Sequence, residues 1–347
     1  MPYKLLRPFL FLLPPETAHH LTLLSLKYLY KIGLLRYVIK PTPQQNPVTI
    51  AGLKFNNPIG LAAGLDKNGE YIDALAALGF GFIEVGTVTP KPQPGNPKPR
   101  LFRLKVHNSL INRMGFNNQG VDYLIDQIEQ SSYQGILGIN IGKNASTPLE
   151  RAVDDYVVCL QKVYRYASYI TINISSPNTK NLRDLQQGDL LDQLLSTLKQ
   201  KQTELVKQHD HTVPLFVKVA PDLDQQQIEH IATKIKQHKM DGLIATNTLV
   251  DRSQFQHVPG IEEQGGISGK LISSRSNQTI AAFRHALGKD FPIIGVGGIH
   301  SIADAKAHLQ AGANMLQLYT GLIYQGPSLI RQIQINLSKA PISQKDQ

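Results

Sequence analysis

The sequence predicts an α/β protein folded as a (β/α)8 TIM barrel, and three observations support this fold class. Eight short apolar runs occur between residues 59 and 318, and an amphipathic stretch of helical period separates most of them. Such alternation is typical of βαβ units around a parallel sheet. Polar residues follow every run, at the ends of strands where barrel active sites lie. The same alternation leaves an open, doubly wound sheet as the alternative.

The chain before the barrel is predicted to be helical. Pro14 and Pro15 open a helix expected from Glu16 to about Leu35, and a shorter helix is expected over Tyr3–Leu13. We expect residues 1–40 to form N-terminal amphipathic helices and residues 41–47, which are rich in proline, to form a linker. The catalytic barrel is then expected over 48–340 and a C-terminal tail over 341–347.

Within the barrel region, the run Val48–Phe55 predicts a short hairpin around Ala51 and Gly52. The eight expected strands are Ile59–Ala62, Phe82–Val85, Ile136–Ile139, Tyr169–Ile172, Leu215–Val219, Gly242–Ala245, Pro292–Gly295 and Met315–Leu318. The clearest helices between them are expected over Tyr71–Leu78, Leu149–Tyr166, Leu190–Leu205 and Ala303–Leu309.

The long gap between the second and third strands predicts an insertion. It holds a proline-rich loop over Thr89–Arg100, followed by two short strands over Leu101–Leu104 and Leu110–Arg113. Because the loop leaves the carboxyl end of a strand, we expect the insertion to cover the mouth of the barrel.

Composition and charge exclude several function classes. The 347 residues include one cysteine, so disulfide frameworks and cysteine-ligated zinc or iron–sulfur sites are excluded. Residues 1–40 hold six basic residues and one acidic residue, a net charge of +5, which is half of the total of +10. A basic, leucine-rich end is typical of a membrane-surface element rather than of a nucleic-acid interface. No run of 18 apolar residues predicts a transmembrane helix.

The polar residues at the strand ends form an unusual chemical set. They include two lysines, no histidine and almost no carboxylate, together with the amides of Asn112, Asn140, Asn173, Asn178 and Asn247. An amide offers a donor and an acceptor together, so several amides suit a ligand with alternating N–H and C=O groups, such as a pyrimidine dione. Lysines suit a ligand carboxylate or a developing anion. Asparagine also occurs in loops simply because it tolerates turn geometry.

Two glycine clusters, Gly265–Gly269 and Gly295–Ile299, favour a phosphate-bearing cofactor, because late barrel loops often bind phosphate through backbone N–H groups. No G-x-G-x-x-G motif follows a strand, so a Rossmann-type NAD site is not supported. Cys159 is expected to pack inside a helix. His209 and His211 precede the fifth strand, on the bottom face, and we expect no metal site there or elsewhere.

With these motifs in place, the chain resembles the dihydroorotate dehydrogenases, specifically the membrane-associated, quinone-dependent class 2. The similarity runs through nearly the whole chain in the family's order. It is carried by the segments Gly60–Lys67, Gly86–Pro90, Asn112–Asn118, Gly138–Lys143, Asn173–Thr179, Ala245–Thr248, Gly265–Gly269, Gly295–Gly298 and Tyr319–Gly321.

The resemblance implies an FMN-dependent oxidation of (S)-dihydroorotate to orotate in de novo pyrimidine (UMP) biosynthesis. Ser176 matches the family's catalytic base, and Thr179 would relay the proton. The flavin contacts that it implies are Ala63, Gly64, Leu65, Asp66, Lys67, Thr87, Asn140, Asn173, Lys218, Thr246, Gly269, Gly298, Tyr319 and Thr320. The substrate contacts that it implies are Lys67, Asn112, Arg113, Met114, Gly115, Phe116, Asn173, Asn178, Asn247 and Thr248.

Two features favour class 2 over a soluble class 1 enzyme that uses fumarate or NAD. Class 1 enzymes have cysteine where this chain has Ser176, and they lack the N-terminal helices. The resemblance therefore implies a quinone as the acceptor, a membrane surface bound through residues 1–40, and no nucleic-acid partner. It also implies a bacterial-type peripheral location on the cytoplasmic side of the cell membrane. The last flavin loop is Tyr319-Thr320, where the family often has Tyr-Ser.

Overall fold

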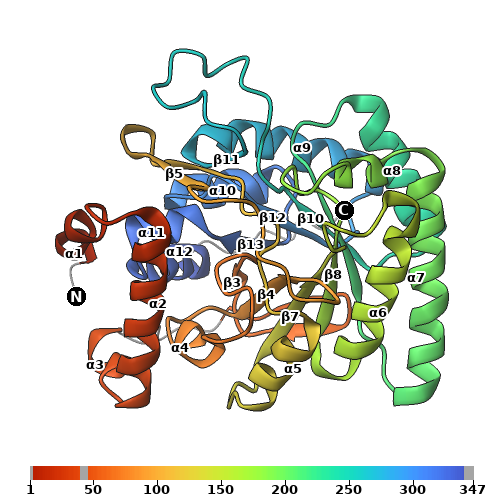
Figure 1. The fold of residues 1–347 in the computed structure, drawn as a ribbon, viewed down its shortest axis with the longest axis horizontal. Coiled ribbons are helices and arrows are strands. Elements are labelled where there is room, and N and C mark those ends of the chain that lie inside the picture. The colour runs from red at the N-terminus through yellow and green to blue at the C-terminus, as the bar shows by residue number, and fades with distance from the viewer. Residues whose placement is uncertain (1–2, 40–45, 340–347) are drawn as a thin grey trace.

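The computed structural model describes residues 3–39 and 46–339, and a closed barrel of eight parallel strands forms its centre (Figure 1). The predicted barrel is confirmed, and the open sheet is excluded because the last strand pairs with the first. In chain order the barrel strands are β3 (Ile59–Leu61), β4 (Phe82–Val88), β7 (Ile136–Ile141), β8 (Tyr169–Asn173), β9 (Leu215–Val219), β10 (Gly242–Ala245), β12 (Ile293–Val296) and β13 (Met315–Leu318).

Helices surround the barrel and bury their apolar faces on the outside of its strands. Each of the four predicted helical stretches contains a helix, although Leu149–Tyr166 is divided into two 3-10 turns flanking an α-helix. The helices are α4 (Ile72–Ala76), α5 (Val121–Glu129), α6 (Ala152–Val163), α7 (Gly188–His209), α8 (Gln225–Gln237), α9 (Ser273–Leu287), α10 (Ile302–Gln310), α11 (Thr320–Gln325) and α12 (Ser328–Lys339). Cys159 is buried in α6, as predicted.

The N-terminal segment forms three helices on one flank of the barrel, at the left of Figure 1. They are α1 (Tyr3–Leu10), α2 (Pro15–Lys31) and α3 (Leu35–Val38). The prediction of one helix from Glu16 to Leu35 is wrong at its end, because Gly33 has a φ of +72° and the chain turns there. The predicted linker lies outside the described residues over 41–45, as does the whole predicted tail over 341–347.

Polar contacts hold these helices to the barrel. Arg100, in the proline-rich loop, forms a buried ion pair of 3.0 Å with Glu16 of α2. Arg103 donates to the carbonyl of Leu13 at 2.7 Å, and its guanidinium lies 4.6 Å from the centre of the Phe11 ring. Tyr3 donates to the carbonyl of Ile323 in α11. The helices are therefore held to the barrel by polar contacts, in addition to the apolar packing of Leu23 in the main hydrophobic core.

A second small sheet covers the mouth of the barrel. The two predicted strands are present as the antiparallel pair β5 (Leu101–Leu104) and β6 (Ser109–Asn112). A third strand, β11 (Gly266–Gly269), pairs with β6, although we expected this glycine cluster to be only a loop. The strand needs glycine at its start, because a Cβ on Gly265 would lie 2.2 Å from the carbonyl oxygen of Asn112.

The predicted hairpin closes the bottom of the barrel. It consists of β1 (Val48–Ile50) and β2 (Leu53–Phe55), which pair antiparallel. Ile50 and Phe55 are buried in one cluster with Phe82, and the Phe55 and Phe82 rings meet edge to face at 5.1 Å. The hairpin therefore excludes water from the lower end of the barrel interior.

Three aromatic rings fill the barrel just above the hairpin, and three glycines make room for them. In the pairing register, Gly60 lies opposite Phe82, Gly138 opposite Tyr169 and Gly242 opposite Phe216. A Cβ on any of these glycines would lie within 2.2 Å of the facing ring. Since real side chains never approach this closely, the register itself requires glycine at these three strand positions.

We expect Gly138→Ala to lower the free energy of unfolding by about 1–3 kcal/mol, the range for an overpacked core. The new methyl would lie 2.2 Å from Cζ of Tyr169, so the ring must move. Denaturant unfolding of the purified protein measures the loss. In the double variant with Tyr169→Leu, the loss should be smaller than the sum of the two single losses. An unchanged free energy of unfolding in Gly138→Ala would contradict this account.

Candidate active site at the barrel mouth

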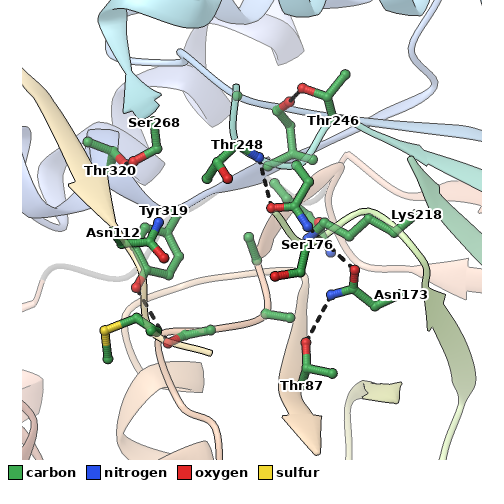
Figure 2. Close-up of a pocket in the computed structure, with 18 of the residues that line it drawn as sticks. Thr87, Asn112, Asn173, Ser176, Lys218, Thr246, Thr248, Ser268, Tyr319 and Thr320 are labelled. Carbon is green, nitrogen blue, oxygen red and sulfur yellow. Dashed lines mark hydrogen bonds between the residues drawn. The ribbon is translucent and has the colours of Figure 1, made fainter. Parts of the chain in front are cut away.

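A cavity of about 960 Å³, its open mouth included, lies at the carboxyl ends of the barrel strands. Figure 2 shows Ser176, Lys218 and Asn173 on one side of it and Asn112 and Tyr319 on the other. The predicted site residues that line it are Ala63, Gly64, Lys67, Thr87, Asn112, Met114, Gly115, Phe116, Asn173, Ser176, Asn178, Lys218, Thr246, Asn247, Thr248, Gly269, Gly298, Tyr319 and Thr320.

Five predicted site residues do not line the cavity. Leu65 is buried in the outer hydrophobic core. Asp66 accepts hydrogen bonds from the backbone N–H groups of Glu70 (3.0 Å) and Tyr71 (2.8 Å), so its carboxylate fixes the turn after β3. Asn140, Arg113 and Thr179 are the other three.

These three have different surroundings. Asn140 is fully buried below the cavity floor, where it contacts Thr87. Arg113 points away from the cavity to Glu263, at 3.1 Å. Thr179 is buried in the loop that carries Ser176, and its hydroxyl has no hydrogen-bond partner within the described chain.

Some lining residues were not predicted individually, although several of them belong to the glycine clusters and motifs that the sequence analysis identified. The wall also contains Ala62, Ser268, Ile272, Val296, Gly297, Ile299, Gln317 and Gly321. Most of these are immediate neighbours of predicted residues, so only one or two positions separate prediction and structure. Gln317 is different, because it stands inside an apolar strand and points into the barrel. The pattern of that strand gave no signal for it.

Three amides of the site, those of Asn140, Asn173 and Asn247, are linked into one network. The Asn140 oxygen accepts from the Thr87 hydroxyl at 2.5 Å and from the Asn173 amide at 3.1 Å. The Asn173 oxygen in turn accepts from the Ser175 hydroxyl at 3.1 Å, and the Asn247 amide donates to that same hydroxyl at 2.9 Å. Because each amide is committed on both ends, the donors and acceptors that face the cavity have fixed directions.

Among the residues that the structure describes, the charged groups on the cavity wall are two ammonium groups, and no carboxylate lines it. Lys67 donates to the carbonyl of Gly64 at 2.7 Å, and burial lowers its pKa to about 8. Burial also lowers the pKa of Lys218, a shift opposed by the negative charge of Glu84. A site with amides, two cations and no anions fits a polar ligand that carries or develops negative charge.

The loop after β8 brings Ser176 over the cavity, and Arg183 ties the loop down. Ser176 is buried, and its hydroxyl accepts from the backbone N–H of Asn178 at 3.3 Å. The Arg183 guanidinium forms a bidentate ion pair with Asp222 at 2.8 and 2.9 Å. It also donates to the carbonyls of Ser175 and Thr248, so it connects the loops after three neighbouring strands.

Glycines let three backbone segments converge at the far end of the cavity. Gly297, Gly298 and Gly269 have φ angles of +117°, +87° and +96°. A Cβ on Gly298 would lie 2.4 Å from Cα of Ser273, and one on Gly269 would lie 2.5 Å from the Asn108 carbonyl oxygen. Within the described residues, the N–H groups of Gly298 and Ile299 donate to no acceptor. This arrangement suits a phosphate.

Comparisons with known proteins agree with this geometry. The family model described as dihydroorotate dehydrogenase matches residues 46–340. A protein from Acinetobacter baylyi named dihydroorotate dehydrogenase (quinone) is 56% identical over 332 residues, which are 96% of this chain and 98% of that protein. One of the same name from Nitrosomonas eutropha is 57% identical over 333 residues, 96% of each chain.

Solved structures show the same relationship. The crystal structure of DHODH from Eimeria tenella in complex with ferulenol has a TM-score of 0.85 and 36% sequence identity, covering 93% of this chain and 90% of that one. The ligand-free form from the same organism has a TM-score of 0.84 and 38% identity, covering 93% of this chain and 94% of that one.

Proposed function

The chain belongs to the dihydroorotate dehydrogenase family, in which it oxidises dihydroorotate to orotate with a quinone as the electron acceptor, and we propose how its residues share this work. The reaction is a step of pyrimidine synthesis. The observation that best supports the proposal is the cavity wall itself. It combines linked amides, two lysines and Ser176, and it carries no carboxylate that would repel an anionic substrate.

The cavity fits FMN as the cofactor. The convergent backbone at Gly269, Gly298 and Thr320 offers N–H groups to the phosphate, and the glycines leave the space it needs. Thr87, Asn173 and Lys218 would hold the flavin ring from the barrel side, together with Ala63, Gly64, Thr246 and Tyr319. When bound, FMN supplies the acceptor for the hydride that leaves C6 of the substrate. Leu65, Asp66 and Asn140 would support these contacts from behind the wall.

The amides and Lys67 would bind the substrate. The Asn178 amide donates to the Asn112 oxygen at 3.1 Å, so two loops meet over the cavity and close around a small ring. Asn173 and Asn247 present further amide groups, and the Lys67 ammonium would pair with the substrate carboxylate. The segment Asn112–Phe116 and Thr248 complete the enclosure. The guanidinium of Arg113 points away from the cavity to Glu263, so the backbone of Arg113, rather than its side chain, would help to enclose the substrate.

Ser176 would remove the proton from C5 of the substrate. A serine hydroxyl is a weak base, so the proton it receives must move on as its own proton departs. The buried hydroxyl of Thr179, three residues along the same loop, has no partner within the described chain and is free to accept that proton through water. Closure of the loop by Arg183 keeps bulk water away from the reacting atoms.

The N-terminal helices would dock on the cytoplasmic face of the cell membrane. Their exposed large apolar residues are Leu5, Leu6, Phe9, Leu12, Leu21, Leu24, Tyr28, Tyr30, Ile32, Leu34 and Tyr37. Over the rest of the described chain, only three large apolar side chains are exposed. The same segment carries the +5 charge that attracts anionic lipid. No helix in the described residues has the length and apolar character to cross a membrane.

A quinone would reach the flavin between these helices and the barrel. His19, on the inner side of α2, is close enough to Lys67 for the lysine charge to act on it, and Lys67 lines the cavity. Burial lowers the pKa of His19 to about 3, so its imidazole is neutral. A neutral imidazole on this side of α2 suits a lipid-soluble acceptor.

We expect Ser176→Ala to slow flavin reduction by dihydroorotate at least about 100-fold, the usual scale for the loss of a positioned base. Anaerobic stopped-flow absorbance measures this half-reaction. FMN content and orotate binding should remain normal, which controls for the fold, and Ser176→Cys should retain part of the rate. Near-normal reduction in Ser176→Ala would remove Ser176 from the role of base.

We expect the pair Phe9→Ser and Leu12→Ser to weaken binding to anionic vesicles at least about tenfold, because each serine replaces an apolar side chain that would enter the lipid. The two side chains are 70% and 81% exposed, so the fold should be unaffected. Co-sedimentation measures binding, and Val158→Ser on α6 is the control. Dihydroorotate should still reduce the flavin at the normal rate. Unchanged sedimentation of the double variant would contradict the membrane proposal.

A further inference from the structure

Glu84 is a fully buried carboxylate in the middle of β4, and the reaction described above gives it no task. Its side chain enters the barrel interior, because its partners come from three other strands. Tyr169 on β8 donates to Oε2 at 2.8 Å, Gln317 on β13 donates to Oε2 at 2.6 Å, and Asn140 on β7 donates to Oε1 at 2.8 Å. Three donors therefore converge on the two oxygens of this buried carboxylate.

The bond to Asn140 determines which way the amide network above it points. Because the Asn140 nitrogen faces Glu84, its oxygen must face Thr87 and Asn173. Both of these residues line the cavity. A residue that offered a donor in place of the carboxylate would favour the opposite orientation of Asn140, and the donors would then meet one another.

Glu84 also balances the charge of Lys218. The two groups are the charged side chains buried inside the barrel, and within the described chain the Lys218 ammonium has no hydrogen bond or ion pair. The strands beside Lys218 contribute the neutral phenol of Tyr169 on β8 and no titratable group on β10. Lys67 and Tyr319 are the other titratable groups on the cavity wall. Glu84 is the group whose negative charge acts on Lys218.

We propose that Glu84 is a positioning residue that keeps Lys218 protonated beneath the flavin and fixes the direction of Asn140. The inference rests on the proposed contact between Lys218 and the flavin. The Glu84 carboxylate does not line the cavity itself. It would act through Lys218, by keeping this cation where the reduced flavin develops negative charge. A buried carboxylate below the cofactor would then control the pH range over which the cation is present.

The test is the flavin midpoint potential of the holoenzyme as a function of pH. Loss of the Lys218 proton changes the slope of this dependence. Removing a negative charge disfavours the ammonium form, so in Glu84→Gln the change of slope should move to lower pH by at least one unit. Tyr169→Phe removes one donor to Glu84 but keeps the carboxylate, so its change of slope should stay in place. An unmoved slope change in Glu84→Gln would overturn the proposal.

Lys218→Met identifies the titrating group. If this variant binds FMN and its midpoint potential still changes slope with pH, another residue titrates. The proposed contact between Lys218 and the flavin is then wrong. Stability gives a second test if Glu84→Gln does not fold. Because neutralising both partners removes the unbalanced charge, Glu84→Gln combined with Lys218→Met should fold and melt above the single Glu84→Gln variant. If the double variant does not melt above the single Glu84→Gln variant, the proposed charge balance between Glu84 and Lys218 is overturned.

Discussion

The pairing of three strand glycines with three aromatic rings is the constraint on which the rest of the barrel depends. Gly60, Gly138 and Gly242 lie in register with Phe82, Tyr169 and Phe216, and the rings close the base together with the β1–β2 hairpin. Because the base is closed by apolar groups, most polar groups higher in the barrel find their hydrogen-bond partners in one another. The ring of Tyr169 belongs to both layers, because its hydroxyl reaches up to Glu84.

Above the rings, the interior changes from apolar to charged to amide-rich over a short distance. Glu84 and Lys218 bring one negative and one positive charge into this interior, and Asn140 joins Glu84 to Thr87 and Asn173. The cavity therefore has a floor with fixed hydrogen-bond directions and a net positive wall. This order suits the proposed anionic substrate and reduced flavin, because no carboxylate of the described residues lines the cavity.

The sequence predicted the barrel well because buried parallel strands read as continuous apolar runs, which need only local pattern. The helices α5, α8, α9, α11 and α12 were not given bounds from the sequence, which named only the clearest amphipathic stretches. β11 was missed because its pairing with β6 joins residues about 150 positions apart. Glu84 and Gln317 were also missed, since only the closed barrel shows that their side chains meet. The cavity residues were predicted from their positions at the ends of the strands and from the resemblance to the dihydroorotate dehydrogenases.

The central claim is that this cavity binds FMN and passes electrons from dihydroorotate to a quinone. The most direct test is the absorbance of the purified protein under anaerobic conditions, followed at the flavin band near about 450 nm. The account predicts that this band bleaches when dihydroorotate is added and returns when a quinone follows, but not when fumarate or NAD follows. A protein that shows no flavin band, or a band that dihydroorotate leaves unchanged, would contradict it.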